Sequence, residues 1–600
     1  MRPHRERVWH NVRPNEITRM CRSHVVLTTA THQARRGKTG VQTWRLACAT
    51  FHKGAKGRET KYESRDYRNP NALWRDVSDR TGTSGRTIVW AHNLSDAIRI
   101  TRVFEQLPAL GWKLTGYNIT TRACWMEWQR SKTTLLLIDS LSFFPTTLDQ
   151  IGNWHGIGTA KLDSDCDDDA DWLVSCRRNN RILYTQVAAY LEWLEAEDMG
   201  NFQITGPAQS WATYRHRFLS HKLTVHDESD ILAAERRAMW AGRCEAYWRG
   251  ELKGERVYEF DFSAAYPRIA RDYALPVKLV GRMPDAYNWR NVIGSQHTGL
   301  LAQITVSTSV PVLPTSHNSR ILWPTGTFQT TVWDVEIEAA LKAGATITVH
   351  RGWLYRKQPA LAAWGTWILE QLAMPDDIVP AWQKAVLKHW SRALIGRFAM
   401  TYNRWEPTGV MPHACIQRGV MYDAQTHVST DIMQVGRDVW EDLGREEWQH
   451  SMPMITGYVQ AIGRVQLWDI LQALGDRKAL YVDTDSILTT AKFAGDLERI
   501  ARSYTKGVLR LKRAWDGFSI YGPRQIVTGH QVRVSGIPRN AQQVDRTHYT
   551  GERRDSLPHS LRNGTWDRVL TRDVSWEVKG VDHRRTGTGF GWTEPVSVGP

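Results

Sequence analysis

The chain has 600 residues, of which 42% are hydrophobic and 23% are charged, and its formal net charge at pH 7 is +16. This length allows several domains with apolar cores, and the excess of lysine and arginine indicates a polyanionic partner. The longest apolar runs are only strand-sized, and the seven cysteines form no Cys-x-x-Cys pair, which argues against a membrane span and against zinc. We therefore expect free thiols in a reducing cytoplasm and no membrane partner.

The first third of the sequence predicts an α/β domain behind a basic tail. Residues 1–20 form the tail, the domain covers residues 21–205, and a helical bridge follows over 206–238. The strand-like runs and the main helix are His24–Thr31, Ile88–Ala91, Leu135–Leu141 and Ile182–Glu195. The acidic run Asp163–Asp171 lacks the glycine and glutamate of a calcium loop, and we interpret it as a solvated loop.

A carboxylate ends a predicted strand in the segment Arg256–Pro267. Residues 257, 259 and 261 share one face of this strand, which ends near Asp261 and leads through a Ser-Ala-Ala turn to Tyr266. An ionised group at the end of a buried strand is costly unless it has a partner.

The segment Ala381–Phe398 is predicted to form a helix with a basic stripe. Lys384, Lys388 and Arg392 follow one another at i, i+4 and i+8, and apolar residues lie on the opposite side. Such a stripe is commonly a solvated helix face. The sharper interpretation is a binding surface for a triphosphate, because three like charges repel one another unless an anion lies along them.

The segment Ala479–Leu488 predicts a β-hairpin with Asp483 and Asp485 at its tip. Alone, this pattern is typical of a tight turn with two solvated aspartates. Together with Asp261 it suggests two metal ions held between strand-end carboxylates, an arrangement that supports phosphoryl transfer.

These motifs and their order resemble those of family B DNA polymerases, and most closely the small viral, plasmid and organellar branch that includes the protein-primed enzymes. The segments Asp261–Pro267, Lys388–Gly396 and Tyr481–Ser486 resemble the first palm motif, the fingers motif and the second palm motif. Weaker resemblances are found in Met239–Gly242, Gln460–Arg464 and Gly522–Ile526. Arg392 and Ile395 stand where the fingers motif usually has Asn and Tyr.

The resemblance implies roles for individual residues. Asp261, Asp485 and the backbone carbonyl of Phe262 would hold two Mg²⁺ ions, for which Mn²⁺ can substitute, and Asp483 would support them. The other implied contacts are the triphosphate (Lys384, Lys388), a steric gate against ribose (Tyr266), and primer or template (Gly242, Arg243, Arg464, Arg524). We add the hypothesis that Arg392 contributes a phosphate contact.

The same family usually carries a 3′–5′ exonuclease domain, whose carboxylates are missing here. Thr28 and Ala30 stand where the first Asp and Glu belong. Asp96 lies one position early, with Ala97 in the strict position, and either Asn179 or Asn180 replaces the last Asp. Since neutral side chains cannot supply the charge that two metals need, we expect an exonuclease fold without activity.

The resemblance implies a multidomain α/β and α+β fold, in which an RNase H-like exonuclease domain precedes a right-hand polymerase of palm, fingers and thumb. The expected divisions are palm 239–285 and 400–505, an insertion 286–355, fingers 360–399, thumb 507–545, and a poorly ordered or accessory tail 546–600.

The expected function is that of a DNA-directed DNA polymerase of a phage or mobile element, without proofreading. Its partners would be a DNA primer–template and dNTPs, and we expect a monomer in the host cytoplasm. The way synthesis starts stays open, including priming by a terminal protein. A nucleic-acid-binding pseudopolymerase without activity is the alternative, and the missing carboxylates disfavour an active nuclease.

Overall fold

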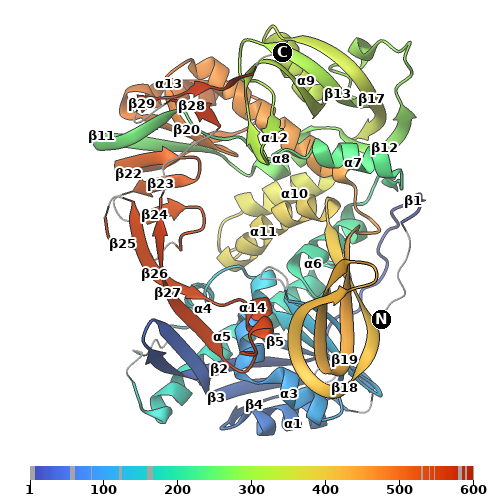
Figure 1. The fold of residues 1–600 in the computed structure, drawn as a ribbon, viewed down its shortest axis with the longest axis vertical. Coiled ribbons are helices and arrows are strands. Elements are labelled where there is room, and N and C mark those ends of the chain that lie inside the picture. The colour runs from blue at the N-terminus through green and yellow to red at the C-terminus, as the bar shows by residue number, and fades with distance from the viewer. Residues whose placement is uncertain are drawn as a thin grey trace.

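The computed structural model describes residues 7–53, 61–82, 84–119, 124–158, 162, 166–528, 531–538, 541–545, 547–578, 584–587 and 591–598. The predictions for 1–20, 163–171 and 546–600 therefore lie partly outside the described residues. Three large β-sheets dominate the molecule, and Figure 1 shows the N-terminal sheet at one end and the other two toward the opposite end, with helices between them.

The N-terminal sheet combines parallel and antiparallel strands. Strand β2 is antiparallel to β3 but parallel to β5, which is parallel to β8 in turn. A run of five buried residues in β2 fits a strand that is covered on both faces. The strand and helix bounds are β2 Ser23–Arg36, β3 Thr39–Lys53, β4 Lys61–Tyr67, β5 Ser84–Ala91, β6 Lys113–Asn118, β7 Trp125–Arg130, β8 Lys132–Asp139, α1 Pro70–Arg80, α2 Leu94–Ile100, α3 Val103–Ala109, α4 Leu148–Trp154 and α5 Asp169–Ala196.

A second sheet carries the aspartates. Its order is β10-β20-β21-β11-β22-β23-β24, and β29 pairs with the start of β11. Helix α12 buries fifteen of its 22 residues, because apolar side chains occur all around it. The bounds are β10 Cys244–Ala246, β11 Trp248–Phe262, β20 Ala479–Asp483, β21 Ser486–Thr490, β22 Leu509–Gly522, β23 Gln525–Thr528, β24 Gln531–Val534, β29 Gly591–Trp592, α8 Ala265–Asp272, α12 Pro453–Leu474 and α13 Ala491–Ser503.

A third sheet occupies the predicted insertion, in the order β12-β17-β13-β16-β31. Helix α9 packs against β13 and β16 through buried residues such as Ile337 and Ala340. The bounds are β12 Leu275–Arg282, β13 Thr298–Thr308, β16 Thr325–Trp333, β17 Thr346–Gln358, β31 Ser597–Val598 and α9 Asp334–Lys342.

Helices α10 (Ala362–Ala373) and α11 (Ala381–Phe398) lie between the sheets (Figure 1). Helix α11 has the predicted bounds, and its apolar side is buried, including Leu387, Trp390 and Leu394. The predicted bridge is also helical, with α6 Gly206–Thr213, a π-helical turn Tyr214–Phe218 and α7 Ser229–Arg237. No helix of the described residues has both the length and the apolar character that crossing a membrane requires.

The prediction that residues 400–505 belong to one unit with the aspartates is wrong for their first half. Among the described residues, strands β18 (Thr401–Asp423) and β19 (Val428–Glu447) pair only with each other, in a long hairpin. The hairpin lies beside the N-terminal sheet in Figure 1. Its Met433 and Val435 are buried in the core of the N-terminal unit, and Trp405 and Ile416 of the same hairpin pack against that core.

Residues 546–600 were predicted to be a poorly ordered or accessory tail, and the described residues of this range are ordered. Strands β26 (His548–Arg554) and β27 (Val569–Glu577) extend the N-terminal sheet, since β27 pairs with β3. Helix α14 (Leu557–Arg562) buries Leu557 and Leu561 in the N-terminal core. The fully buried Arg99 donates hydrogen bonds to the Asp555 carbonyl (2.9 Å) and the Ser560 hydroxyl (2.8 Å), which fixes this docking.

Leu561→Ala is expected to destabilise the N-terminal unit. Removing a fully buried leucine side chain costs about 2–5 kcal/mol, so the thermal midpoint of that unit should fall. His559→Ala on the same helix removes a half-exposed side chain and should leave the midpoint nearly unchanged. Equal midpoints for the two variants in calorimetry would contradict the docking of α14.

Candidate active site

Two neighbouring strands bring the predicted aspartates together. Strand β11 pairs with β21 so that Asp261 lies opposite Ser486, next to Asp485. The backbone amide of Phe262 donates to the Asp485 carbonyl at 2.9 Å, which fixes the end of β11 to the tip of the β20–β21 hairpin. Both predicted carboxylates therefore belong to one site, and the backbone of Phe262 lies beside them.

The tip of the hairpin has a strained backbone conformation, which a hydrogen bond to the segment 242–243 holds in place. Thr484 has a φ of 61°, which is unusual for a residue other than glycine, and its amide donates to the Arg243 carbonyl at 2.7 Å. A Cβ atom at Gly242 would lie only 2.6 Å from Cγ2 of Thr484. Gly242 therefore leaves the space that the Thr484 side chain occupies.

The charge of the two carboxylates is only partly compensated, by the single cation Lys512. Burial and the neighbouring Asp261 raise the pKa of Asp485 to about 6. Oδ2 of Asp261 is paired with Lys512, whereas Oδ1 is buried without a hydrogen-bond partner among the described residues. An orphaned carboxylate oxygen beside a desolvated carboxylate is a strong attractor for a cation.

The donor set fits Mg²⁺. Hard carboxylate oxygens suit this ion, which keeps several waters and needs only one or two protein carboxylates beside phosphate oxygens. The described residues contain no group of three or more His, Cys, Asp or Glu side chains arranged for a metal, so these two aspartates would share the ions with water and substrate. Asp483 accepts a hydrogen bond from the Thr484 hydroxyl (3.1 Å).

A cavity of about 590 Å³ opens above the aspartates. Tyr266, Arg392 and Arg464 line it with Asp483 and Asp485. Burial and the charge of Asp485 raise the pKa of Tyr266, so its hydroxyl stays protonated beside the carboxylates. The volume suits a small-molecule ligand the size of a nucleotide.

The basic stripe on α11 is present, but its three members differ. Lys388 and Arg392 are exposed, and Arg392 lines the cavity. Lys384 instead donates to Asp376 (2.5 Å) and to the Met374 carbonyl, and its side chain is only 16% exposed. The structure thus brings Arg392 to the aspartates and keeps Lys384 in a local ion pair.

Two of the predicted DNA-contacting arginines are buried. Arg243 is 2% exposed and paired with Glu245 at 2.5 Å, so the predicted contact with primer or template is wrong for its side chain in this structure. Arg464 is paired with the buried Glu336 at 2.9 Å, yet it lines the cavity and its Nη2 has no partner among the described residues. Arg524 is exposed at a tight turn with a φ of 55°.

Sequence reasoning missed Lys512, the lysine that contacts Asp261. In the pairing of β11 with β22, Glu259 lies opposite Arg513 and Phe260 lies opposite Leu511. Lys512, between these two pairs, is therefore the extra residue of a β-bulge. Bulges re-aim side chains beside functional sites. Lys512 also lies 3.5 Å from the buried Glu259, which meets Arg513 at 3.0 Å. The basic residues at the start of β22 were the sequence signal that could have pointed to Lys512.

Three of the predicted exonuclease positions, Thr28, Ala30 and Asn180, lie together in one site. The Thr28 hydroxyl donates to the Cys176 carbonyl at 3.1 Å, and Ala30 is buried next to Cys48 and Cys176. Asn180, rather than Asn179, points into this site: its amide donates to the carbonyls of Val26 (2.8 Å) and Cys48 (2.9 Å).

The two other predicted carboxylates of this domain, Asp96 and Asp139, already have partners. Asp96 is paired with Arg99 at 2.6 Å and with Arg554 from the C-terminal segment, while Ala97 is buried. Asp139 accepts hydrogen bonds from the amides of Asn93 and Leu141, and burial raises its pKa to about 6. Neither aspartate offers a free pair of oxygens to a metal ion.

Comparisons with known proteins show what this fold resembles. Residues 180–408 match the family of DNA polymerase type B, organellar and viral. No curated protein matches the sequence. The structure resembles phi29 DNA polymerase complexed with primer–template DNA, with a TM-score of 0.65 and 13% identity over 93% of this chain and 100% of that one. The complex with primer–template and incoming nucleotide gives the same values, and the orthorhombic crystal form of phi29 polymerase a TM-score of 0.63 at 11% identity.

Residues 180–408 thus resemble the organellar and viral branch of type B DNA polymerases, and the fold of the chain is similar to that of phi29 DNA polymerase. These findings agree with the resemblance that the motifs indicate.

Asp485→Asn is expected to stabilise the metal-free protein at pH 8. The raised pKa means that the folded chain binds this proton more tightly than the unfolded chain, so stability falls as pH rises from about 4 to about 6 and stays low above. Removing the charge should gain about 1–3 kcal/mol at pH 8 and little at pH 4.

Thermal midpoints in EDTA at both pH values measure this effect. Mg²⁺ should raise the midpoint of the wild type more than that of the variant. Asp516→Asn, which changes an 81% exposed side chain, is the matched control. If the variant is less stable than the wild type at pH 8, the ionised Asp485 does not lower the free energy of unfolding, and the prediction is wrong.

Proposed function

We propose that the protein is a DNA-directed DNA polymerase that transfers nucleotides by a two-metal reaction at Asp261 and Asp485. The observation that carries the proposal is the pair of aspartates at the ends of adjoining strands, of which Asp485 is desolvated and lines a cavity of about 590 Å³ with Arg392 on its wall. The family and the fold support the same conclusion.

The residues around the cavity would divide the work of the reaction. Two Mg²⁺ ions bound to Asp261 and Asp485 would activate the primer hydroxyl and stabilise the leaving pyrophosphate. Lys388 and Arg392 would neutralise the triphosphate from the exposed stripe of α11. Tyr266 would close the cavity where a ribose 2′-hydroxyl would sit.

Lys512 would act at the primer side of the site. Its ammonium group is paired with Asp261 and lies 3.5 Å from Glu259, so it holds one carboxylate while no metal is bound. When a cation takes that carboxylate, Lys512 becomes available to a phosphate of the primer end.

We also propose that the sheets correspond to the units of a polymerase. The sheet with the aspartates would be the palm, α10 and α11 the fingers, and residues 507–545 the start of the thumb. The N-terminal sheet has antiparallel β4-β3-β2 followed by parallel β2-β5-β8, which supports an RNase H-like exonuclease fold. Its neutral site at Thr28, Ala30 and Asn180 supports the absence of exonuclease activity.

A pseudopolymerase is the second candidate. The observation that favours it is the ion pair between Lys512 and Asp261, which places a cation on a predicted metal ligand. A primer-extension assay separates the two candidates.

Purified protein is expected to extend a labelled primer on its template with Mg²⁺ and four dNTPs. Asp485→Ala should slow extension by about 10³-fold or more, because the loss of a metal ligand raises the barrier by at least ~4 kcal/mol. Asp516→Asn should extend at the wild-type rate. If the wild type does not extend with Mg²⁺ or Mn²⁺ although it binds primer–template in a gel-shift assay, the pseudopolymerase is favoured.

A primer with a mismatched 3′ end is expected to stay intact when the protein is supplied with metal but no dNTPs. The neutral exonuclease positions cannot hold two cations, so degradation should stay at the level of a protein-free reaction. Gel electrophoresis of the labelled primer measures it. Metal-dependent shortening that disappears in Asp96→Ala would contradict an inactive exonuclease.

A further inference from the structure

Lys512 is shared between two carboxylates. Its ammonium group contacts Oδ2 of Asp261 and lies 3.5 Å from Oε1 of Glu259. The second distance is too long for a hydrogen bond but within the range of an ion pair. Because the lysine side chain is flexible and 40% exposed, a shift of less than about 1 Å would bring its ammonium group to hydrogen-bond distance from Glu259.

Glu259 is a buried carboxylate whose two oxygens have different surroundings. The residue is 4% exposed and lies at the wall of the cavity above the aspartates. Its Oε2 lies 3.0 Å from Arg513 and 3.7 Å from Arg533, and Nε1 of Trp515 donates to it at 3.4 Å. Its Oε1 instead faces Lys512. Oε1 is therefore the oxygen that can accept the ammonium group.

Two arginines and a tryptophan hold the Glu259 carboxylate in this orientation. The guanidinium groups of Arg513 and Arg533 lie 5.1 Å and 5.0 Å from the ring of Trp515, and both reach Oε2 of Glu259. Contacts with cationic and aromatic partners offset the cost of burying a carboxylate. With Oε2 fixed by three side chains, Oε1 stays directed toward Lys512.

Lys512 covers the oxygen of Asp261 that an entering cation would meet. Oδ1 of Asp261 is buried, whereas the side chain as a whole is 22% exposed, so a cation from solvent reaches Oδ2 first. At a separation of about 4 Å, an ammonium group and a divalent cation repel one another strongly in a partly buried site. A divalent cation therefore takes Oδ2 only when Lys512 leaves it.

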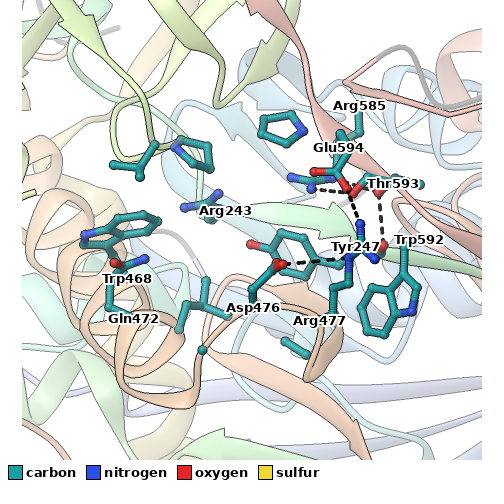
Figure 2. A pocket seen from close by; sticks show the side chains of 16 residues that line it. Arg243, Tyr247, Trp468, Gln472, Asp476, Arg477, Arg585, Trp592, Thr593 and Glu594 are labelled. Atoms are coloured by element: carbon teal, nitrogen blue, oxygen red, sulfur yellow. Dashed lines mark hydrogen bonds and ion pairs between the residues drawn. The ribbon is translucent and has the colours of Figure 1, made fainter.

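The cations of a neighbouring cavity have a different arrangement. This cavity, of about 430 Å³, is bordered by α12 and the start of β20, and in Figure 2 Arg477 lies beside Asp476 and Glu594. The other ion pairs there are Arg243–Glu245 (2.5 Å) and Arg585–Glu245 (3.1 Å). Lys512 differs from these cations because one of its two partners is a predicted metal ligand.

We propose that Glu259 is a positioning residue that accepts Lys512 when a divalent cation binds Asp261. This inference rests on the proposed two-metal function and assigns the exchange of ion pairs that frees the metal ligand. Glu259 acts through Lys512: it gives the displaced ammonium group a second carboxylate and keeps it at the edge of the site. Without Glu259, Lys512 stays on Asp261 and competes with the cation.

A double-mutant cycle of Mn²⁺ affinity tests the proposal. The full chain without DNA is titrated with Mn²⁺, free Mn²⁺ is measured by electron paramagnetic resonance, and the binding lost in Asp485→Asn defines the site. Glu259→Gln should weaken this binding about tenfold, because Lys512 then stays on Asp261. In the Lys512→Met background the same substitution should change the affinity by about twofold or less, since no ammonium group needs an acceptor.

Two further variants keep the test independent of folding defects. Because Glu259 is buried, its replacement can disturb folding, whereas Lys512→Met changes a 40% exposed side chain. Lys512→Met alone should tighten Mn²⁺ binding severalfold, because it removes the competing cation from Asp261. Glu251→Gln makes the same chemical change as Glu259→Gln on the same strand, away from its end, and should bind Mn²⁺ like the wild type.

Two results would overturn the proposal and leave the two-metal function intact. The first is an equal loss of Mn²⁺ affinity on Glu259→Gln in both backgrounds, which is the result expected from the loss of a nearby negative charge alone. The second is a Lys512→Met variant that binds Mn²⁺ no more tightly than the wild type. If the wild type binds no more Mn²⁺ than Asp485→Asn, the metal site itself is wrong, and the role of Glu259 is wrong with it.

Discussion

Two carboxylates that repel one another form the constraint on which the rest of the structure depends. Asp261 and Asp485 end neighbouring strands, and the bond from the Phe262 amide to the Asp485 carbonyl prevents them from separating. Their mutual repulsion and burial raise the pKa of Asp485 to about 6. The fold therefore holds an electrostatically unfavourable arrangement, which a bound divalent cation would relieve.

The neighbouring residues Gly242, Arg243 and Lys512 support this arrangement. Gly242 leaves the space that the Thr484 side chain occupies, and the carbonyl of Arg243 holds the Thr484 amide in the turn. Lys512 reaches Asp261 from a bulge in the neighbouring strand. The polar groups of the N-terminal unit, in contrast, have partners within the protein. Asn180 and Thr28 donate hydrogen bonds to backbone carbonyls, and Asp96 is paired with two arginines.

Local pattern made the centre of the molecule predictable. Helix α11 and the β20–β21 hairpin have the expected positions, because the period of apolar residues and the spacing of charges are properties of short segments. The pairing partners of distant segments were not predictable. The hairpin 401–447 and strand β27 dock on the N-terminal unit through a few buried residues such as Met433 and Leu561.

Predictions for individual side chains failed for a related reason. A motif shows that Arg243 follows Gly242 but not that its side chain turns inward to Glu245, and a run of charged residues does not show which one a bulge aims at Asp261. The choice between Asn179 and Asn180 also needed the backbone, since only Asn180 reaches the carbonyls of β2 and β3. Burial and register, rather than residue type, decide these roles.

Counting bound Mn²⁺ by electron paramagnetic resonance tests the central claim most directly. The wild type, with primer–template DNA and a non-hydrolysable dNTP, should bind two ions per chain in addition to those on the DNA and nucleotide alone. Asp485→Asn should lose at least one of them while still binding the DNA. Equal ion counts for the wild type and the variant would show that the paired aspartates are not a metal site and would contradict this account.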